Sequence, residues 1–138
     1  MTTVPNRPAP LAIPGELFDT TRVDVIPVHP GADATLAAAA VQAGATGVVL
    51  AGTGTGNGNH ALLEWVRHAV NSGVAVGLST RVPEGPVVPI YGNGGGVDLL
   101  NAGAVSLGGL PLYHGRLLVA LLRQAHVPVT SASVAPYR

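Results

Sequence analysis

Apolar strand-like runs alternate with helix-like segments in the first half of this chain, and this alternation limits the possible folds more than any other feature. The runs lie at residues 22–28, 46–52 and 74–79, and the helix-like segments between them lie at 33–43 and 61–72. Each helix-like segment ends at a glycine, as helices often do. The second and third runs are apolar on both faces, which is typical of a parallel sheet that helices cover on both sides. The pattern predicts βαβ units in a small doubly wound sandwich.

The second half of the chain continues this pattern less regularly. A long loop rich in proline and glycine occupies residues 81–96. It is followed by a predicted short helix at 97–103, a fourth strand at 104–107 and a last helix at 112–125. The fold class predicted from the whole pattern is an α/β three-layer sandwich with a parallel sheet of about four strands, Rossmann-like or flavodoxin-like.

One domain is expected, with a connecting segment on either side. Residues 1–20 contain four prolines and no periodicity, and they are predicted to form an extended linker. Residues 21–126 form the predicted α/β domain, and residues 127–138 form a tail that gives no structural signal. The core must consist of Ala, Val and Leu, because hydrophobic residues make up 47% of the chain and aromatic residues only 4%.

Composition excludes several classes of function. The net charge is zero and there is no basic run, which argues against a nucleic-acid partner or an anionic membrane surface. Every basic residue is an arginine, so a lysine base, a Schiff base and a P-loop lysine are all excluded within this chain. No cofactor is predicted. No stretch is long and apolar enough to cross a bilayer and no secretory signal opens the sequence, which favours a cytoplasmic setting.

The candidate site lies where the predicted strands end. In an open parallel sheet, ligands bind beyond the carboxyl ends of the strands, where helix N-termini direct free N–H groups outward. Three segments must emerge at that edge, at residues 29–31, 52–59 and 79–81. The unusual residues of the sequence are concentrated in these segments.

The loop GTGTGNGN, residues 52–59, is the strongest local feature. Its glycines, Gly56 and Gly58 among them, allow positive φ or a close approach to a ligand. The loop matches neither the dinucleotide-binding nor the Walker pattern, since asparagines replace the third glycine and no lysine follows. Asn59 is predicted to cap the following helix. Asn57 can donate and accept hydrogen bonds at once, which suits a small polar ligand such as an amino acid.

Other residues at this edge have simpler interpretations. His29 and His60 lack a third metal ligand at compatible spacing, so no metal site is predicted and both are expected to face solvent or cap a helix. Ser79 is not in a nucleophile elbow, because its segment lacks the second glycine of that motif. Arg81 can pair equally well with a ligand carboxylate or with Glu84 in the same loop.

Four longer segments carry a combined signature. They read VDVIPVHPGAD, GATGVVLAGTGTGNGN, VAVGLSTRVPEG and PLYHGRLLVALL. In this order and spacing they resemble the C-terminal domain of bacterial L-asparaginases, of the asparaginase/glutaminase family, over residues 22–122. The segment at 1–20 likewise resembles the link between the two domains of that family.

The resemblance implies a domain that is not catalytically complete alone. Those enzymes hydrolyse the side-chain amide of L-asparagine to L-aspartate and ammonia. They use a threonine in a TGGT motif, supported by a second Thr-Asp pair and a lysine, all on the N-terminal domain. None of these groups occurs in this chain, so no catalytic residue is predicted here.

In the family, the C-terminal domain lends an asparagine of the glycine-rich loop to the active site of a neighbouring subunit. Alignment from the following helix puts that asparagine at Asn57, with Asn59 as the second candidate. Several members also lend a glutamate from the loop after RVPxG. The corresponding stretch here has no glutamate, so that contact is absent or is made by Tyr91 or Asp98. The resemblance thus implies a substrate-lining loop of Gly56, Asn57, Gly58 and Asn59, with Ser79, Arg81 and Tyr91 as further loop contacts.

Three functional hypotheses follow. The first is the C-terminal domain of an L-asparaginase, which provides scaffold, subunit contacts and a substrate-lining loop. The second is a free-standing module that binds an amino acid without catalysis. The third, an independent hydrolase, needs a nucleophile among Ser79, Thr80, Thr53 and Thr55, and no base is positioned for any of them. The expected partners are an amino-acid ligand and either the missing N-terminal domain or a second copy that covers the apolar segment 117–122.

Overall fold

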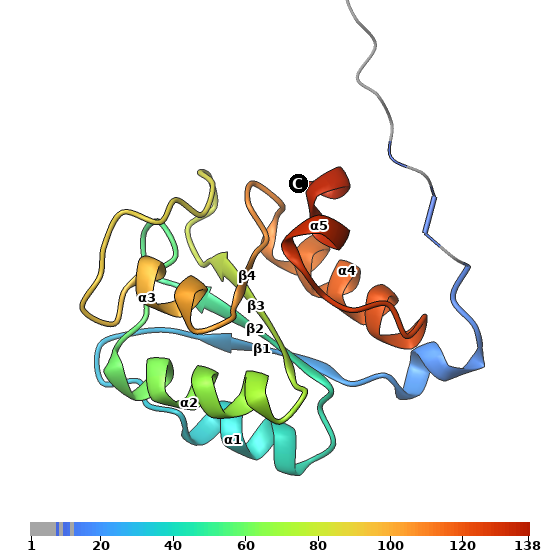
Figure 1. Cartoon of the computed structure of the whole chain (residues 1–138), viewed down its shortest axis with the longest axis horizontal. Coiled ribbons are helices and arrows are strands. Elements are labelled where there is room, and N and C mark those ends of the chain that lie inside the picture. The colour runs from blue at the N-terminus through green and yellow to red at the C-terminus, as the bar shows by residue number, and fades with distance from the viewer. Residues whose placement is uncertain (1–7, 9, 12) are drawn as a thin grey trace, which may run out of the picture.

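The structure, a computed structural model, describes residues 8, 10, 11 and 13–138, so the predicted linker lies partly outside the described residues. Its centre is a four-stranded parallel sheet with helices on both faces (Figure 1). The strands are β1 (Val23–Pro27), β2 (Gly47–Gly52), β3 (Ala75–Thr80) and β4 (Val105–Ser106). The α-helices are α1 (Thr35–Gln42), α2 (His60–Asn71), α3 (Gly96–Asn101), α4 (Leu112–Gln124) and α5 (Ser131–Val134), and the 3-10 helices are η1 (Glu16–Thr20) and η2 (Ala135–Tyr137).

The predicted α/β three-layer sandwich is confirmed, but its winding differs from the prediction. The strands lie in the order β1-β2-β3-β4, so each crossover continues in the same direction. Repeated right-handed crossovers in one direction place α1, α2 and α3 on a single face, as Figure 1 shows. A doubly wound sheet would need the strand order to reverse, and this sheet has no such reversal.

The face covered by α1, α2 and α3 contains the larger part of the core. Ala37 and Ala40 of α1 are buried, and their small side chains let that helix approach the sheet closely. Leu62 and Val66 of α2 are almost completely buried in the same cluster, together with Leu99 of α3. Leu62 and Val66 are four positions apart, so they lie on one face of α2.

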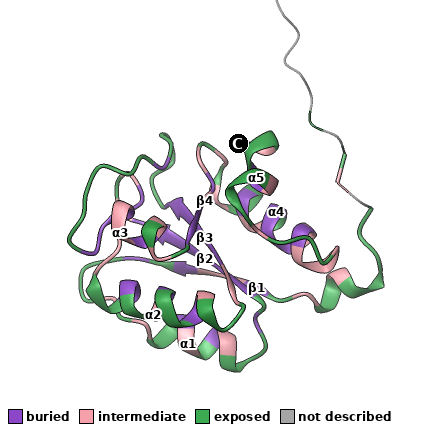
Figure 2. Cartoon of the chain, viewed as in Figure 1, coloured by how far each residue is buried: buried purple, intermediate pink, exposed green. Residues whose placement is uncertain are grey.

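The other face of the sheet is covered mainly by α4. A side chain at Gly115 would lie 2.8 Å from Leu107, and one at Gly47 would lie 3.1 Å from Val119, so two glycines allow this helix to lie close to the strands. Val119 is completely buried, whereas Leu117 is 42% exposed. The apolar segment of α4 is thus buried on one side and open on the other. Figure 2 shows the resulting pattern, with purple strands between the two helical layers.

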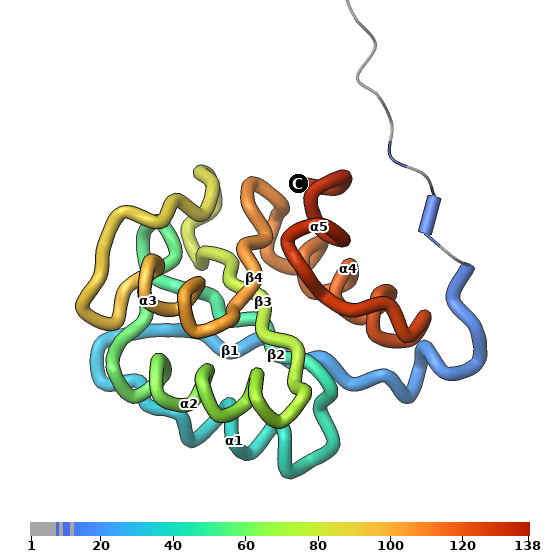
Figure 3. Tube along the Cα trace, in the orientation of Figure 1, coloured from blue at the N-terminus to red at the C-terminus, as the bar shows by residue number. Residues whose placement is uncertain are grey.

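Both ends of the described chain pack against α4. Residues 127–138, for which the sequence indicated no structure, contain α5 and η2, and Val134 of α5 is completely buried. At the other end, Phe18 of η1 packs against the same cluster, and the backbone N–H of Gly15 donates to the Gln124 side chain over 3.4 Å. Figure 3 shows η1 lying beside α4 before the chain enters β1. Among the described residues, no helix combines the length and apolar character that crossing a membrane requires.

Candidate functional site

The three segments predicted to share an edge are linked there by hydrogen bonds. The N–H of Arg81, which follows β3, donates to the carbonyl of Gly52 at the end of β2 over 3.0 Å. The side chain of Asn59 donates to the carbonyl of Ala32, in the loop after β1, over 2.8 Å. The glycine-rich loop between β2 and α2 therefore lies at the centre of this edge, with a contact on each side.

The glycine-rich loop, residues 52–59, folds into a tight turn closed by Thr53 and Asn57. The N–H of each of these two residues donates to the carbonyl of the other over 2.9 Å. Gly56 has a φ of 101°, a conformation that residues with a side chain rarely adopt. A side chain at Gly52 would lie 2.7 Å from the backbone of Gly56, so the turn folds back directly onto the end of β2.

Asn57 has one end of its side-chain amide fixed and the other end free. Its oxygen Oδ1 accepts a hydrogen bond from the backbone N–H of Gly96, the first residue of α3, over 3.0 Å. Its nitrogen Nδ2 donates to no partner within the described residues, and Asn57 is partly exposed. The side chain is therefore held in a defined orientation with an unused donor at the edge of the sheet.

Asn59 uses both ends of its amide inside the domain, and its predicted role as a helix cap is confirmed. Its Oδ1 accepts from the backbone N–H of Leu62 over 3.0 Å, which caps α2. Its Nδ2 makes the bond to Ala32 described above. The two asparagines of the loop thus differ in one respect that matters for binding, which is that the Nδ2 of Asn59 is tied to Ala32, whereas the Nδ2 of Asn57 has no hydrogen-bond partner in the described residues.

Thr80 has a structural role at this edge of the sheet that the sequence did not predict. It is 7% exposed, and its hydroxyl donates to the carbonyl of Gly54 in the glycine-rich loop. The same hydroxyl accepts from the N–H of Val82 over 3.1 Å. Thr80 therefore connects the loops after β2 and β3. The sequence showed only that Thr80 directly follows the predicted strand at 74–79, and this did not distinguish its role from that of a candidate nucleophile.

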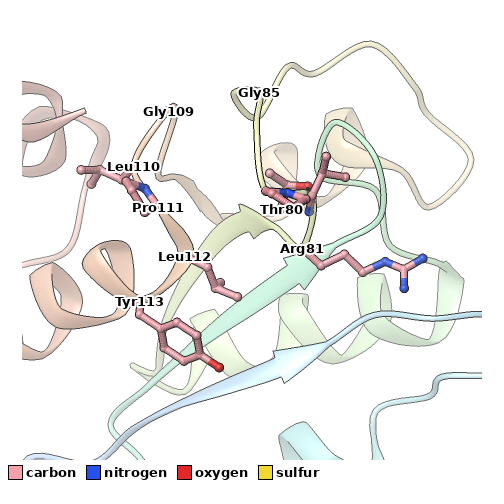
Figure 4. Close-up of a pocket in the computed structure, with 10 residues that line it drawn as sticks. Thr80, Arg81, Gly85, Gly109, Leu110, Pro111, Leu112 and Tyr113 are labelled. Atoms are coloured by element: carbon pink, nitrogen blue, oxygen red, sulfur yellow. Dashed lines mark hydrogen bonds between the residues drawn. The ribbon is translucent and has the colours of Figure 1, made fainter.

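The further loop contacts expected from the resemblance lie at different depths. Ser79 is only 1% exposed, so it offers little surface to a ligand. Arg81 and Thr80 border a cavity of about 330 Å³ between the loop after β3 and the start of α4 (Figure 4). Figure 4 shows the Arg81 side chain directed away from Tyr113 on the opposite wall. Tyr91 is 59% exposed. In the part of the chain that the structure describes, Arg81 forms no ion pair with Glu84.

The remaining polar groups of the edge hold loops in place. The ring nitrogen Nε2 of His60 lies 2.8 Å from Oδ1 of Asn93, a residue with a φ of 56° that the sequence analysis did not single out. Asp98 accepts from the N–H of Gly94 over 2.8 Å, so that carboxylate, one of two candidates for the missing glutamate, is already in use. No three His, Asp or Glu side chains gather as a metal site among residues 8, 10, 11 and 13–138.

One carboxyl group at this edge has a perturbed pKa. The backbone N–H of Thr35, at the start of α1, donates to Oδ1 of Asp33 over 2.8 Å. This hydrogen bond favours the ionised carboxylate and lowers the pKa of Asp33 below its ordinary value. Asp33 is fully exposed, and its carboxylate accepts from the backbone N–H of the first residue of α1.

Comparison with known proteins identifies the family to which the chain belongs. The sequence model of the glutaminase/asparaginase C-terminal domain matches residues 22–130. A protein of Deinococcus radiodurans described as a probable L-asparaginase is 40% identical over 79 residues, which is 56% of this chain and 24% of the relative. The match thus spans about a quarter of the length of that relative. Because the family match extends over most of the chain, the protein belongs to the glutaminase/asparaginase C-terminal domain family.

Proposed function

We propose that this chain acts as the C-terminal domain of an L-asparaginase and lends Asn57 to an active site that a catalytic domain completes. The observation that supports the proposal best is the half-used amide of Asn57. Its Oδ1 is held by Gly96, and its Nδ2 is left without a partner in the described residues. A donor fixed in advance loses little conformational freedom on binding, which favours recognition of a ligand carbonyl or carboxylate.

The hydroxyl groups of the edge support a role in binding and scaffold over one in catalysis. The hydroxyl of Thr80 donates to the Gly54 carbonyl, so its proton already has an acceptor. Thr55 has a buried hydroxyl without a partner, and no described contact supplies a base for it. A hydroxyl nucleophile needs an adjacent group that accepts its proton. The amidohydrolase step of the proposed enzyme is therefore assigned to the catalytic domain, which in this family carries the TGGT threonine.

An apolar surface supports the second part of the proposal, which is contact with another subunit or domain. Leu117 is 42% exposed and Tyr113 is 72% exposed on the outer side of α4. An apolar hollow of about 240 Å³ lies beside them, lined in part by Leu110, His114 and Leu121. We assign this surface to a contact with the catalytic domain or with a second copy of the chain. The cytoplasmic location suggested by the sequence stays a prediction.

The test is reconstitution with an asparaginase domain that carries the TGGT nucleophile. The chain alone is expected to release no more ammonia from L-asparagine than a blank, and the combined domains are expected to release it. Asn57→Asp keeps an acceptor for Gly96 but removes the free donor, so it should reduce kcat/KM by a factor that corresponds to about 1–3 kcal/mol. Asn59→Ser keeps the helix cap and removes an Nδ2 that is already tied to Ala32 inside the domain, so it serves as the matched control.

Three outcomes would count against the proposal. Turnover of L-asparagine by the chain alone would show a complete catalytic site in these residues. Equal activity of Asn57→Asp and wild type in the combined protein would remove Asn57 from the site. Tight binding of L-aspartate to the isolated chain, measured by calorimetry, would favour a free-standing amino-acid-binding module instead.

A further inference from the structure

Residues 130–138 are held to the domain by specific contacts. The side chain of Thr130 accepts from the N–H of Ser133 over 3.1 Å, and the side chain of Ser133 accepts from the N–H of Thr130 over 2.9 Å, which caps α5. Val134 is completely buried in the cluster that α4 forms with the sheet. The segment is therefore a folded part of the domain.

Arg138, an exposed residue, lies against the turn that follows β4. Its guanidinium nitrogen Nη1 donates to the carbonyl of Ser106 over 3.0 Å. Its aliphatic carbons lie across Gly108, where a side chain would come within 3.0–3.3 Å of them. Gly108 itself has a φ of 60°, and its N–H donates to the hydroxyl of Ser106 over 3.2 Å. Arg138 thus covers the open side of a turn whose shape depends on glycine.

The same turn supports the glycine-rich loop through Val87. The N–H of Val87 donates to the carbonyl of Gly108 over 3.0 Å, and the N–H of Val88 donates to the carbonyl of Thr55 over 3.0 Å. Val87 is 7% exposed, and its methyl group lies 2.9 Å from the point where a side chain on Gly56 would begin. Val87 therefore fills the space that Gly56 leaves, directly beside Asn57.

We infer that Arg138 is a positioning residue for Asn57, acting through Gly108, Val87 and Gly56. Each step is a direct contact, and closely packed atoms transmit a displacement because they leave no space to absorb it. Without Arg138, the turn at Gly108 loses the side chain that packs on it. The carbonyl of Gly108, which accepts from the N–H of Val87, is then held less firmly. The consequence for ligand handling rests on the proposed function of Asn57, but the mechanical connection does not.

Amide hydrogen exchange on the purified chain tests the connection itself. In Arg138→Ala, the N–H groups of Val87, Val88 and Gly56 should exchange about three to ten times faster, as the loss of one ordinary hydrogen bond would cause. The N–H groups of β2 should be unchanged. Arg138→Lys should restore much of the protection, because a lysine can cover Gly108 and donate to Ser106. Arg67→Ala, which removes an exposed arginine of α2, is the matched control.

A double-mutant cycle tests whether the effect of Arg138 reaches Gly56 through Val87. If Val87 carries the effect, Arg138→Ala should add little to the exchange at Gly56 once Val87→Ala is present. In the reconstituted enzyme, Arg138→Ala should raise the KM for L-asparagine by a similar factor and leave kcat nearly unchanged, since the substrate-lining donor is displaced and the nucleophile is not.

Two results would overturn the inference. One is unchanged exchange at Val87, Val88 and Gly56 in Arg138→Ala. The other is equally faster exchange throughout the chain, including β2, which would show general destabilisation in place of positioning. A reconstituted wild-type enzyme without activity would count against the proposed function only, because the exchange experiment needs no ligand.

Discussion

The loops after β2 and β3 leave the same edge of the sheet, but they are held in opposite ways. The glycine-rich loop, residues 52–59, closes on itself and is bonded by Thr80, Gly96 and Ala32 from three neighbouring segments. The loop at 81–95 is mostly exposed, and Figure 2 shows it largely in green. Its buried residues, Val87, Gly94 and Gly95, are the ones that pack against the first loop.

The difference separates two tasks at one edge. The glycine-rich loop is rigid enough to orient one amide, whereas the second loop presents apolar side chains to solvent. Val82, Val88, Ile90 and Tyr91 of that loop are 36–59% exposed. Such a surface gains stability only when something covers it, which agrees with a site that another segment completes. The first loop therefore orients the Asn57 amide, and the second provides an exposed apolar surface.

The comparison is tested most strongly by adding one methyl group to each loop. In Gly52→Ala the new carbon would lie 2.7 Å from the backbone of Gly56, which cannot move without opening the turn. We expect a loss of about 3 kcal/mol or more in the free energy of unfolding. In Gly92→Ala the nearest atom, on Asp98, is at an ordinary contact distance of 3.6 Å, so the change should stay within about 0.5 kcal/mol.

Urea unfolding of the two variants beside wild type provides the measurement. Similar losses in both variants would mean that the loops are equally constrained, and the comparison would fail. A folded Gly52→Ala variant of nearly wild-type stability would show that the turn at 53–57 adapts easily, and a fixed orientation of Asn57 would then be untenable.

The second prediction concerns the hydroxyl that joins the loops. Thr80→Val removes the donor to Gly54 and the acceptor for Val82 without changing the shape of the side chain. Because two backbone groups in part-buried hydrogen bonds lose their partner, we expect a cost of about 1–2 kcal/mol in unfolding free energy. Thr55→Val is the control, since the Thr55 hydroxyl is buried and has no partner among the described residues, and its removal should be neutral or stabilising. If both variants unfolded at the same urea concentration, Thr80 would have no special role.

The third prediction compares the two asparagines by stability alone. Asn59→Ser keeps an acceptor for Leu62 but loses the donor to Ala32, so it should cost about 1 kcal/mol. Asn57→Asp keeps the acceptor for Gly96 and loses a donor that has no partner within the described chain, so thermal unfolding should be nearly unchanged. A larger loss for Asn57→Asp than for Asn59→Ser would reverse the assignment of structural and binding roles.

The fold was predictable because its signals are local and repeated. Three apolar runs and two glycine-terminated helices define the layers, and Asn59 could be identified as a cap from its place before α2. The single direction of winding was not predictable, since strand order depends on contacts between segments distant in sequence. Residues 131–137 also gave no signal, because α5 is four residues long and depends on the burial of Val134 for its stability.

The sequence predicted where the candidate site lies but not the contacts that hold its residues in place. The glycines and Asn57 marked the loop, but the bond from Gly96 to Asn57 joins residues 39 positions apart. The contact between Val87 and Gly56 is equally remote, and no local pattern in a loop rich in proline and glycine distinguishes a buried valine from an exposed one. Thr80 was missed as an organiser for the same reason, since its partner Gly54 belongs to another loop.

The smallest expected effect extends the comparison to the loop after β1, which Ala32 joins to the glycine-rich loop. The hydrogen bond from Thr35 lowers the pKa of Asp33, so the folded state binds a proton there less readily than the unfolded state. The stabilisation is therefore complete above the ordinary carboxyl pKa and is lost as the pH falls through the lower pKa of the folded state. Asp33→Asn keeps a neutral acceptor and removes only the charge. Wild type should exceed this variant slightly in stability at neutral pH, and urea unfolding should show the two converging as the pH falls below the ordinary carboxyl pKa. A difference in unfolding free energy between wild type and Asp33→Asn that stayed constant from neutral pH to pH 3 would mean that the charge of Asp33 does not help to hold this loop. The contacts that hold this edge of the sheet rigid would then end at Asn59.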